Sequence, residues 1–257
     1  MKHASYSAGS WLASFVLVVL AGCGESDSSS TSQGISGSKA KIIKLDNAIY
    51  SLAANELVRV DISDPANPQI TDEVSAGRNA ETLTTDGEAL YIGSPGDVRT
   101  YLYNENTGLQ FIDDSRRQIT GQDPVIVDEA GEYAYSSIVT QERTDSQGNQ
   151  SGNGALYVYE IDDAKNITEL SFYPNIGYVQ GLALWEKNLL VCDPVDGIIQ
   201  FDVSDPLLVE QLNQITFVLC EDVIHLGDGH FVTVGEEGIY QLVPYEGNNL
   251  AAISLYR

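Results

Sequence analysis

Basic residues, cysteines and catalytic motifs are all scarce in this sequence. The 13 Lys and Arg residues stand against 37 Asp and Glu, giving a formal net charge of −24, which argues against nucleic acid or an anionic lipid surface as a partner. Only three cysteines occur, and no cluster of cysteine and histidine suggests a zinc site. A Gly-x-Ser-x-Gly elbow, a Walker loop and a zinc-protease signature are all missing. The sequence therefore favours a protein without enzymatic activity, and no cofactor is expected.

Long hydrophobic runs are missing too. The most apolar stretch, Trp11–Leu20, is shorter than the roughly 20 residues that a membrane-spanning helix needs, but it suits a secretory signal. The last residue of this stretch and the three after it, Leu-Ala-Gly-Cys from Leu20 to Cys23, resemble the lipobox of bacterial lipoproteins. The resemblance implies a signal peptide over residues 1–22, lipidation of Cys23 (palmitate included) and a membrane contact through that lipid. An ordinary signal peptide with a chance cysteine is the alternative.

Residues 23–38 are predicted to form a flexible tether. Gly24–Ser38 is rich in Ser and Gly and has no apolar face to bury. A glycine rather than an aspartate after the cysteine implies, by the rules of the lipoprotein family, the outer membrane. The expected location is therefore the cell envelope, with periplasmic and surface-exposed positions both open.

The remaining residues, 39–257, contain an internal repeat. The segments Val58–Pro65 and Ile199–Pro206 both read apolar-x-apolar-Asp-apolar-Ser-Asp-Pro, and three weaker copies align with them. One column is acidic in all five copies, at intervals of 41, 58, 42 and 41 residues; its members are Asp64, Glu105, Asp163, Asp205 and Glu246. The long interval contains a polar insertion, Gln141–Asn153. Without it the period is about 42, which is typical of propeller blades.

Each copy reads as four short strands, here called a to d. In the second copy these are Glu81–Thr85, Ala89–Ile92, Arg99–Tyr103 and Leu109–Ile112. Residues that tolerate positive φ mark the a–b turns, with centres expected at Asp86-Gly87, Ala130-Gly131, Lys187-Asn188 and Asp228-Gly229. No stretch has helical periodicity with caps. We therefore predict an all-β fold, a five-bladed β-propeller of four-stranded antiparallel blades, preceded by the signal peptide and tether.

The first and fourth copies resemble the LVIVD repeat of bacterial secreted and surface β-propellers. The similar segments are Asn55–Gln69 and Asp196–Glu210, and the resemblance implies the fold rather than a function. In both copies the Asp of the Ser-Asp-Pro phrase is expected to accept hydrogen bonds from backbone N–H groups, and the proline to stop the strand. No spare strand is evident for closing the ring, so closure is left to packing between the first and last blades or to residues near Ser38–Ile43.

Ligand sites in propellers tend to lie on the face that carries the d–a and b–c connections. On that basis the candidate binding residues are those of the d–a connections: Arg78, Asn79, Gln122, Asp123, Tyr178, Gln180, Glu221 and Asp222. Cys192 and Cys220 are placed on the same face of adjacent blades, where an exported compartment permits a disulfide; two buried thiols are the alternative. The insertion lies there too, as a neutral surface loop or as a contact arm.

These observations favour a lipid-anchored binding or scaffold module whose partner is a protein or a glycan of the cell envelope. The rival hypothesis is a glycan-active enzyme, resembling glycosidases, that uses the acids Asp123, Glu221 and Asp222. A calcium ion held by Asp193, Asp196 and Glu221 is a weaker alternative, since no known calcium-loop spacing supports it.

Overall fold

The computed structural model describes residues 39–94, 97–115, 124–144, 150–245 and 249–257. The predicted signal peptide, Cys23 and the tether lie outside these residues. The described part is all-β, and none of its segments forms a helix; accordingly, it offers no helix with the length and apolar character needed to cross a bilayer.

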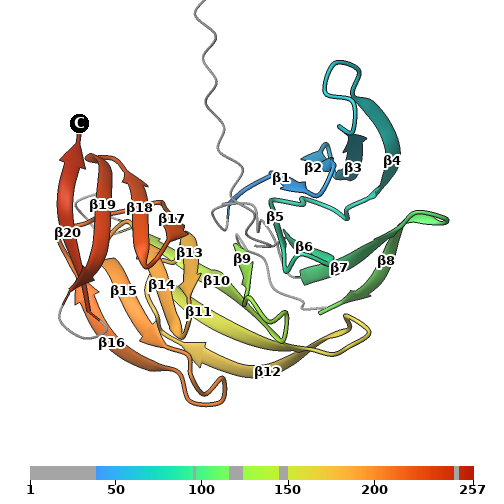
Figure 1. Ribbon diagram of the computed structural model, residues 1–257. Coiled ribbons are helices and arrows are strands. Elements are labelled where there is room, and N and C mark those ends of the chain that lie inside the picture. Colours follow the sequence, from blue (N-terminus) through green and yellow to red (C-terminus); the bar gives the residue numbers. More distant parts are fainter. Residues whose placement is uncertain (1–38, 95–96, 116–123, 145–149, 246–248) are drawn as a thin grey trace, which may run out of the picture. The chain divides into compact units, whose positions relative to one another are not determined.

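Twenty strands form five four-stranded antiparallel sheets, and each sheet uses four consecutive strands (Figure 1). The predicted five-bladed propeller of four-stranded blades is therefore confirmed. Blade 1 has β1 (Ile42–Leu45), β2 (Ala48–Ala53), β3 (Glu56–Asp61) and β4 (Gln69–Ser75); blade 2 has β5 (Thr82–Thr85), β6 (Ala89–Ser94), β7 (Asp97–Asn104) and β8 (Gly108–Asp114); blade 3 has β9 (Val125–Val127), β10 (Tyr133–Thr144), β11 (Gln150–Ile161) and β12 (Ile167–Pro174); blade 4 has β13 (Gly181–Trp185), β14 (Asn188–Asp193), β15 (Gly197–Asp202) and β16 (Glu210–Ile215); blade 5 has β17 (Asp222–Gly227), β18 (His230–Gly235), β19 (Gly238–Tyr245) and β20 (Asn249–Tyr256).

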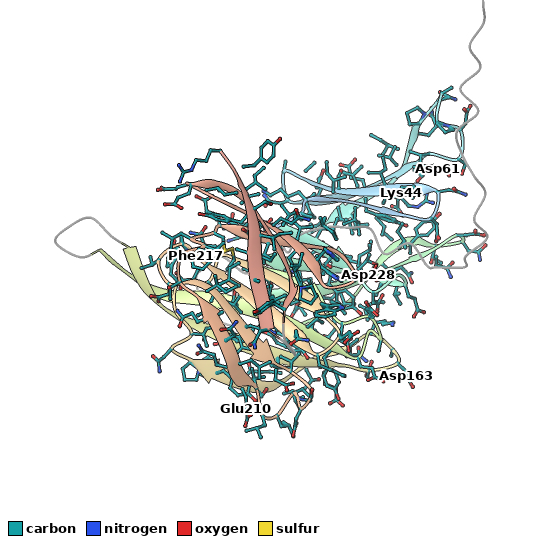
Figure 2. All side chains as sticks on the ribbon, turned by 60° about the vertical axis from the view of Figure 1, so that its left-hand side comes forward. Lys44, Asp61, Asp163, Glu210, Phe217 and Asp228 are labelled. Atoms are coloured by element: carbon teal, nitrogen blue, oxygen red, sulfur yellow. A yellow bond between two sulfur atoms is a disulfide. The ribbon has the colours of Figure 1, made fainter. Side chains whose placement is uncertain are left out.

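The first strands of consecutive blades contact one another: β1 with β5, β5 with β9, β9 with β13, and β13 with β17. The a–b and c–d turns share one end of the blades, and the d–a and b–c connections share the other. In Figure 2 Asp163, in a c–d turn, and Asp228, in an a–b turn, lie on the opposite side from Phe217, in a d–a connection.

A bulge recurs at the same place in every blade. The pairing of strands c and d shifts register after Arg59, Thr100, Val158, Gln200 and Gln241. These positions are 41, 58, 42 and 41 residues apart, the same intervals as in the acidic column of the sequence. A bulge adds twist to a strand pair. Its recurrence at these intervals shows that the backbone geometry repeats with the same spacing as the sequence.

The Asp residues of the repeated phrase shape the turn after strand c, as expected. Asp64 Oδ1 accepts a hydrogen bond from the N–H of Ala66 (3.1 Å), and Asp205 Oδ1 accepts one from that of Leu207 (2.9 Å). The preceding acid of the phrase, Asp61 in blade 1, accepts in the same way from Ser63 N–H (2.7 Å), and this bond lowers its pKa. The phrase therefore ends strand c and builds the turn.

Two local predictions were wrong. In blade 4 the a–b turn is centred on Glu186-Lys187, because Trp185 pairs with Asn188 and Glu186 adopts a φ of 52°. Asn188 is instead buried within β14, where its side-chain oxygen accepts a hydrogen bond from Gln200 (2.9 Å). The polar insertion was considered as a neutral surface loop or a contact arm, and the loop conformation is wrong, because β10 and β11 extend into it and pair as far as Thr144 with Gln150.

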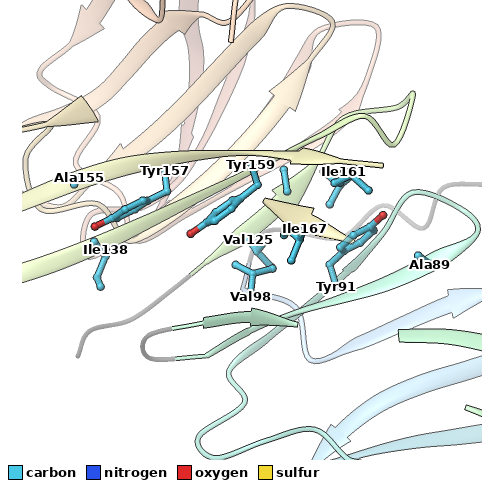
Figure 3. Close-up of a cluster of buried hydrophobic side chains, with 12 residues drawn as sticks. Ala89, Tyr91, Val98, Val125, Ile138, Ala155, Tyr157, Tyr159, Ile161 and Ile167 are labelled. Atoms are coloured by element: carbon cyan, nitrogen blue, oxygen red, sulfur yellow. The ribbon is translucent and has the colours of Figure 1, made fainter. Parts of the chain in front are cut away.

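Buried side chains fill the space between neighbouring blades. The cluster in Figure 3 joins blades 2 and 3: Tyr91 and Val98 come from blade 2, and Val125, Ile138 and Tyr157 come from blade 3. Similar clusters join blades 1 and 2, blades 3 and 4, and blades 4 and 5. Tyrosines fill much of these clusters, since Tyr91, Tyr101 and Tyr159 are among the largest fully buried side chains.

Candidate functional site

A cavity of about 340 Å³ lies where the first strands of the blades begin. We call this end the d–a mouth. Its lining comes from the residues immediately before or at the start of those strands, together with the first described residues of the chain: Lys39, Lys41, Glu81, Thr82, Pro124 and Gln180.

One repeat column supplies most of the d–a mouth. The residues immediately before the first strands of the five blades are Lys41, Glu81, Pro124, Gln180 and Glu221. In blades 2, 4 and 5 the backbone N–H of this residue donates to a carbonyl at the end of strand b, at 2.9, 2.9 and 2.7 Å. The same backbone position therefore presents a different side chain from each blade, and four of the five line the cavity.

The segment Lys39–Lys41 is held across the d–a mouth. Lys39 Nζ donates a hydrogen bond to Gln180 Oε1 of blade 4 (3.2 Å). The Ala40 carbonyl accepts from Leu83 N–H of blade 2 (2.7 Å), and the Lys41 carbonyl accepts from Leu52 N–H of blade 1 (2.8 Å). Lys39, Ala40 and Lys41 therefore connect blades 4, 2 and 1 at the d–a mouth.

Burial and mixed charge shift the pKa values of three groups at the d–a mouth. Desolvation lowers the pKa of Lys39, against the attraction of Asp222, Glu221 and Glu81. Desolvation raises the pKa of Glu81, and the nearby Lys41 and Lys39 oppose that rise. Desolvation likewise raises the pKa of Asp222, although a hydrogen bond from Val223 N–H and the charge of Lys39 act in the other direction. Titratable groups with shifted pKa values around a cavity are typical of functional sites.

The structure brings some of the candidate residues together. Gln180, Glu221 and Asp222 gather around Lys39. Tyr178, two residues before Gln180 in the sequence, is buried, and its N–H donates to Asp193 Oδ2 (2.6 Å). The exposed Asn79 donates its N–H to Asn55 Oδ1 (2.7 Å) within blade 1, and its neighbour Arg78 is exposed and does not line the cavity. Gln122 and Asp123 lie outside the described residues.

Sequence reasoning missed Lys39, Lys41 and Glu81 as members of the site. The signal for Lys41 and Glu81 was present, because both occupy the repeat column that also contains Gln180 and Glu221. Lys39 belongs to no repeat column, and its partner Gln180 is 141 residues away in the sequence. No local pattern could have found that contact.

Cys192 and Cys220 form a disulfide between blades 4 and 5, with Cα atoms 5.4 Å apart. Cys192 lies in β14, and Cys220 lies just before β17. Both side chains are fully buried in the cluster that joins the two blades. The disulfide therefore fixes the side of the d–a mouth from which Glu221 and Asp222 project.

Asp193 has a structural role in place of the calcium-ligand role considered above. Its Oδ1 accepts from the N–H groups of Val195 (2.7 Å) and Asp196 (2.9 Å), and its Oδ2 accepts from that of Tyr178. Burial raises its pKa, while these hydrogen bonds oppose the rise. Within the described ranges no three His, Cys, Asp or Glu side chains are grouped as metal ligands would be.

No protein-family model matches the chain, and no curated protein matches its sequence. Solved structures do resemble it. A protein from Lactobacillus plantarum has a TM-score of 0.62 and 14% identity, over 82% of this chain and 69% of that one. A functionally unknown protein from Desulfotomaculum acetoxidans has a TM-score of 0.56 and 10% identity, over 82% and 68%. At such identities the likeness extends to the fold alone.

The periplasmic gluconolactonase PpgL of Pseudomonas aeruginosa also aligns with 81% of this chain and 82% of its own, at 10% identity. Its TM-score is 0.45, too low to support any argument about the activity of this chain.

Proposed function

We propose that the protein is a binding module of the bacterial cell envelope, held to the outer membrane by a lipid on Cys23, and that its d–a mouth binds part of a protein or glycan partner. The observation that carries the binding role is the repeat column before the first strands, which presents different side chains from four of the five blades to one cavity. Buried clusters between neighbouring blades hold these side chains in place before the partner arrives, which reduces the entropy cost of binding.

The chemistry of the d–a mouth suits a polar partner with both donors and acceptors. Lys39 and Lys41 offer ammonium groups, and Glu81, Glu221 and Asp222 offer carboxyl groups. The cavity of about 340 Å³ is near the lower end of the roughly 300–1,000 Å³ of small-molecule pockets. It fits one sugar residue of a glycan, or one side chain of a protein loop.

The test compares the parent protein with Glu81→Gln and Gln180→Ala in a glycan array and in pull-downs from envelope extracts. Losing a hydrogen bond to a charged group costs roughly 1.5–3 kcal/mol, so each variant should bind its partner at least about tenfold more weakly. Glu210→Gln, a change in β16 at an exposed position, is the matched control. Equal recovery of partners by all four proteins would contradict the placement of the site.

The lipid anchor is tested separately. It rests on the Leu20–Cys23 motif and on the polar segment after it. Radiolabelled palmitate should be incorporated into the parent protein but not into the Cys23→Ala variant. That variant should also be lost from the membrane fraction. Labelling of the Cys23→Ala variant would disprove the assignment of that cysteine.

A glycan-active enzyme is the second candidate, and one observation favours it. Asp222 is a carboxyl group with a raised pKa beside the exposed Glu221 at the rim of the d–a mouth, and a raised pKa is what a general acid requires. A glycan-hydrolysis screen with Asp222→Asn and Glu221→Gln separates the two functions. If the parent protein hydrolyses a glycan and both variants do not, catalysis is favoured over binding as the function.

A further inference from the structure

A second cavity, of about 420 Å³, lies at the opposite end of the first strands. We call it the a–b cavity. The ends of β5, β9, β13 and β17 and the a–b turns of blades 3 and 4 line it, so four blades contribute. All of its lining residues belong to the described part of the chain, and none of them is shared with the d–a mouth.

One wall of the a–b cavity is apolar and carries a single buried hydroxyl. Ile126 and Leu184 form the apolar part, and Leu226 adds a side chain that is 44% exposed. Thr84 is only 7% exposed, and no described residue hydrogen-bonds with its hydroxyl. Because Thr84 lines the cavity, its hydroxyl is available to a polar atom of a ligand.

The other side of the a–b cavity is acidic. Asp128, Glu129 and Glu186 line it, against a single lysine, Lys187. Burial lowers the pKa of His225, the remaining titratable group of the lining, and its Nε2 accepts a hydrogen bond from Gly229 N–H (3.2 Å). The lining therefore has an excess of negative charge at neutral pH, which attracts cations and repels anions.

Asp128 is held in place for such a contact. Its Oδ1 accepts hydrogen bonds from the N–H groups of Glu132 (2.8 Å) and Tyr133 (3.0 Å) in the a–b turn of its own blade. Its Oδ2 has no hydrogen bond to any described residue. The backbone thus fixes the carboxylate while one oxygen stays available to a donor.

We propose that the a–b cavity binds an organic cation, namely a protonated amine on an apolar chain. The ammonium group binds to Asp128 Oδ2 and the Thr84 hydroxyl, and the chain packs on Ile126 and Leu184. A free alkylamine and a lysine side chain of a protein partner share this chemistry. This proposal is independent of the d–a mouth and of whatever partner binds there.

The experiment is an NMR titration of the domain with three probes of matched shape: pentylamine, pentanol and pentanoate. We expect pentylamine to shift the amide signals of Thr84, Leu184 and Leu226 and to bind at least tenfold more tightly than the other two. Binding should weaken at least tenfold in Asp128→Asn, which keeps the Oδ1 acceptor for the backbone, and should weaken as salt is added. Glu81→Gln, at the d–a mouth, should leave it unchanged.

A second arm distinguishes the two sources of the amine. A short peptide containing lysine is compared with the same peptide containing norleucine and with free pentylamine, and tighter binding of the lysine peptide identifies a protein as the source. Leu184→Trp, which fills the cavity, is a second test that does not depend on the folding of Asp128→Asn. Equal binding of pentanol and pentylamine, or amine binding that persists in both variants, would overturn the proposal.

Discussion

The disulfide between blades 4 and 5 should contribute a large share of the stability of the domain. Cys192 and Cys220 are 28 residues apart, and closing a loop of that length in the unfolded chain is worth about 3–4 kcal/mol in the chain-entropy treatment. For a domain of this size, 1 kcal/mol shifts the midpoint of thermal unfolding by about 2–4 °C. Reduction should therefore lower the midpoint by about 6–16 °C.

The assay is thermal and guanidinium unfolding of the parent protein with and without a phosphine reductant, with equilibration long enough for the buried disulfide to be reached. The reduced parent is the better comparison because it keeps both sulfur atoms, whereas Cys192→Ala with Cys220→Ala also removes packing from the cluster between the blades. That double variant should be less stable than the reduced parent by about 1–3 kcal/mol, because two buried groups become smaller. Loss of less than about 1 kcal/mol on reduction, or two free thiols in the unreduced unfolded protein, would refute the reasoning.

Four further outcomes are expected. Asp86→Ala should lower the free energy of unfolding by about 3–5 kcal/mol, because the Asp86 side chain is 2% exposed and its loss leaves Lys165 without its buried partner. Glu88→Gln removes an equally short ion pair to the same lysine, but from a side chain that is 72% exposed. It should therefore lower the free energy of unfolding by at most about 1 kcal/mol. Burial opposes ionisation of Asp86, but hydrogen bonds from two backbone N–H groups, a tyrosine hydroxyl and Lys165 outweigh it and lower its pKa. The stability that it contributes is therefore present above about pH 4 and is lost as the pH falls through its folded pKa, so acid titration of stability should be shallower in Asp86→Asn. Gly197→Ala should destabilise by more than about 1 kcal/mol in denaturant unfolding, because φ is +88° and a Cβ would meet the backbone of β16. Lys39→Met should raise further the pKa values of the half-buried carboxyl groups of Glu81 and Asp222 at the d–a mouth, measured by carboxyl-carbon NMR. Unchanged values would contradict the electrostatic description of that mouth.

The sequence predicted the blades because the same turn-forming residues recur at the spacing of one blade. Asp64 and Asp205 build turns through their own side chains, and such local bonds need no knowledge of the rest of the fold. The Glu186-Lys187 turn was missed because no sequence pattern marks a glutamate at positive φ. Asn188, by contrast, is a residue type common in turns, yet it is buried in a strand. The polar insertion was misjudged because its Gln, Ser and Gly residues describe exposure rather than backbone conformation.

The two cavities were harder to predict than the strands. The acids and the amide at the d–a mouth could be placed from the strand order, and Gln180, Glu221 and Asp222 do gather there. The a–b cavity depends on how far the ends of four first strands stand apart, which is a property of blade packing. Thr84 and Asp128 are separated in sequence by a whole repeat, and each looks like an ordinary strand or turn residue.

The hydrogen bonds of Lys39, Ala40 and Lys41 have a mechanical consequence. A force applied to the chain at Lys39 would act on blades 4, 2 and 1 together, because each of the three residues bonds to one of these blades. Pulling this segment away would therefore have to break bonds to three blades.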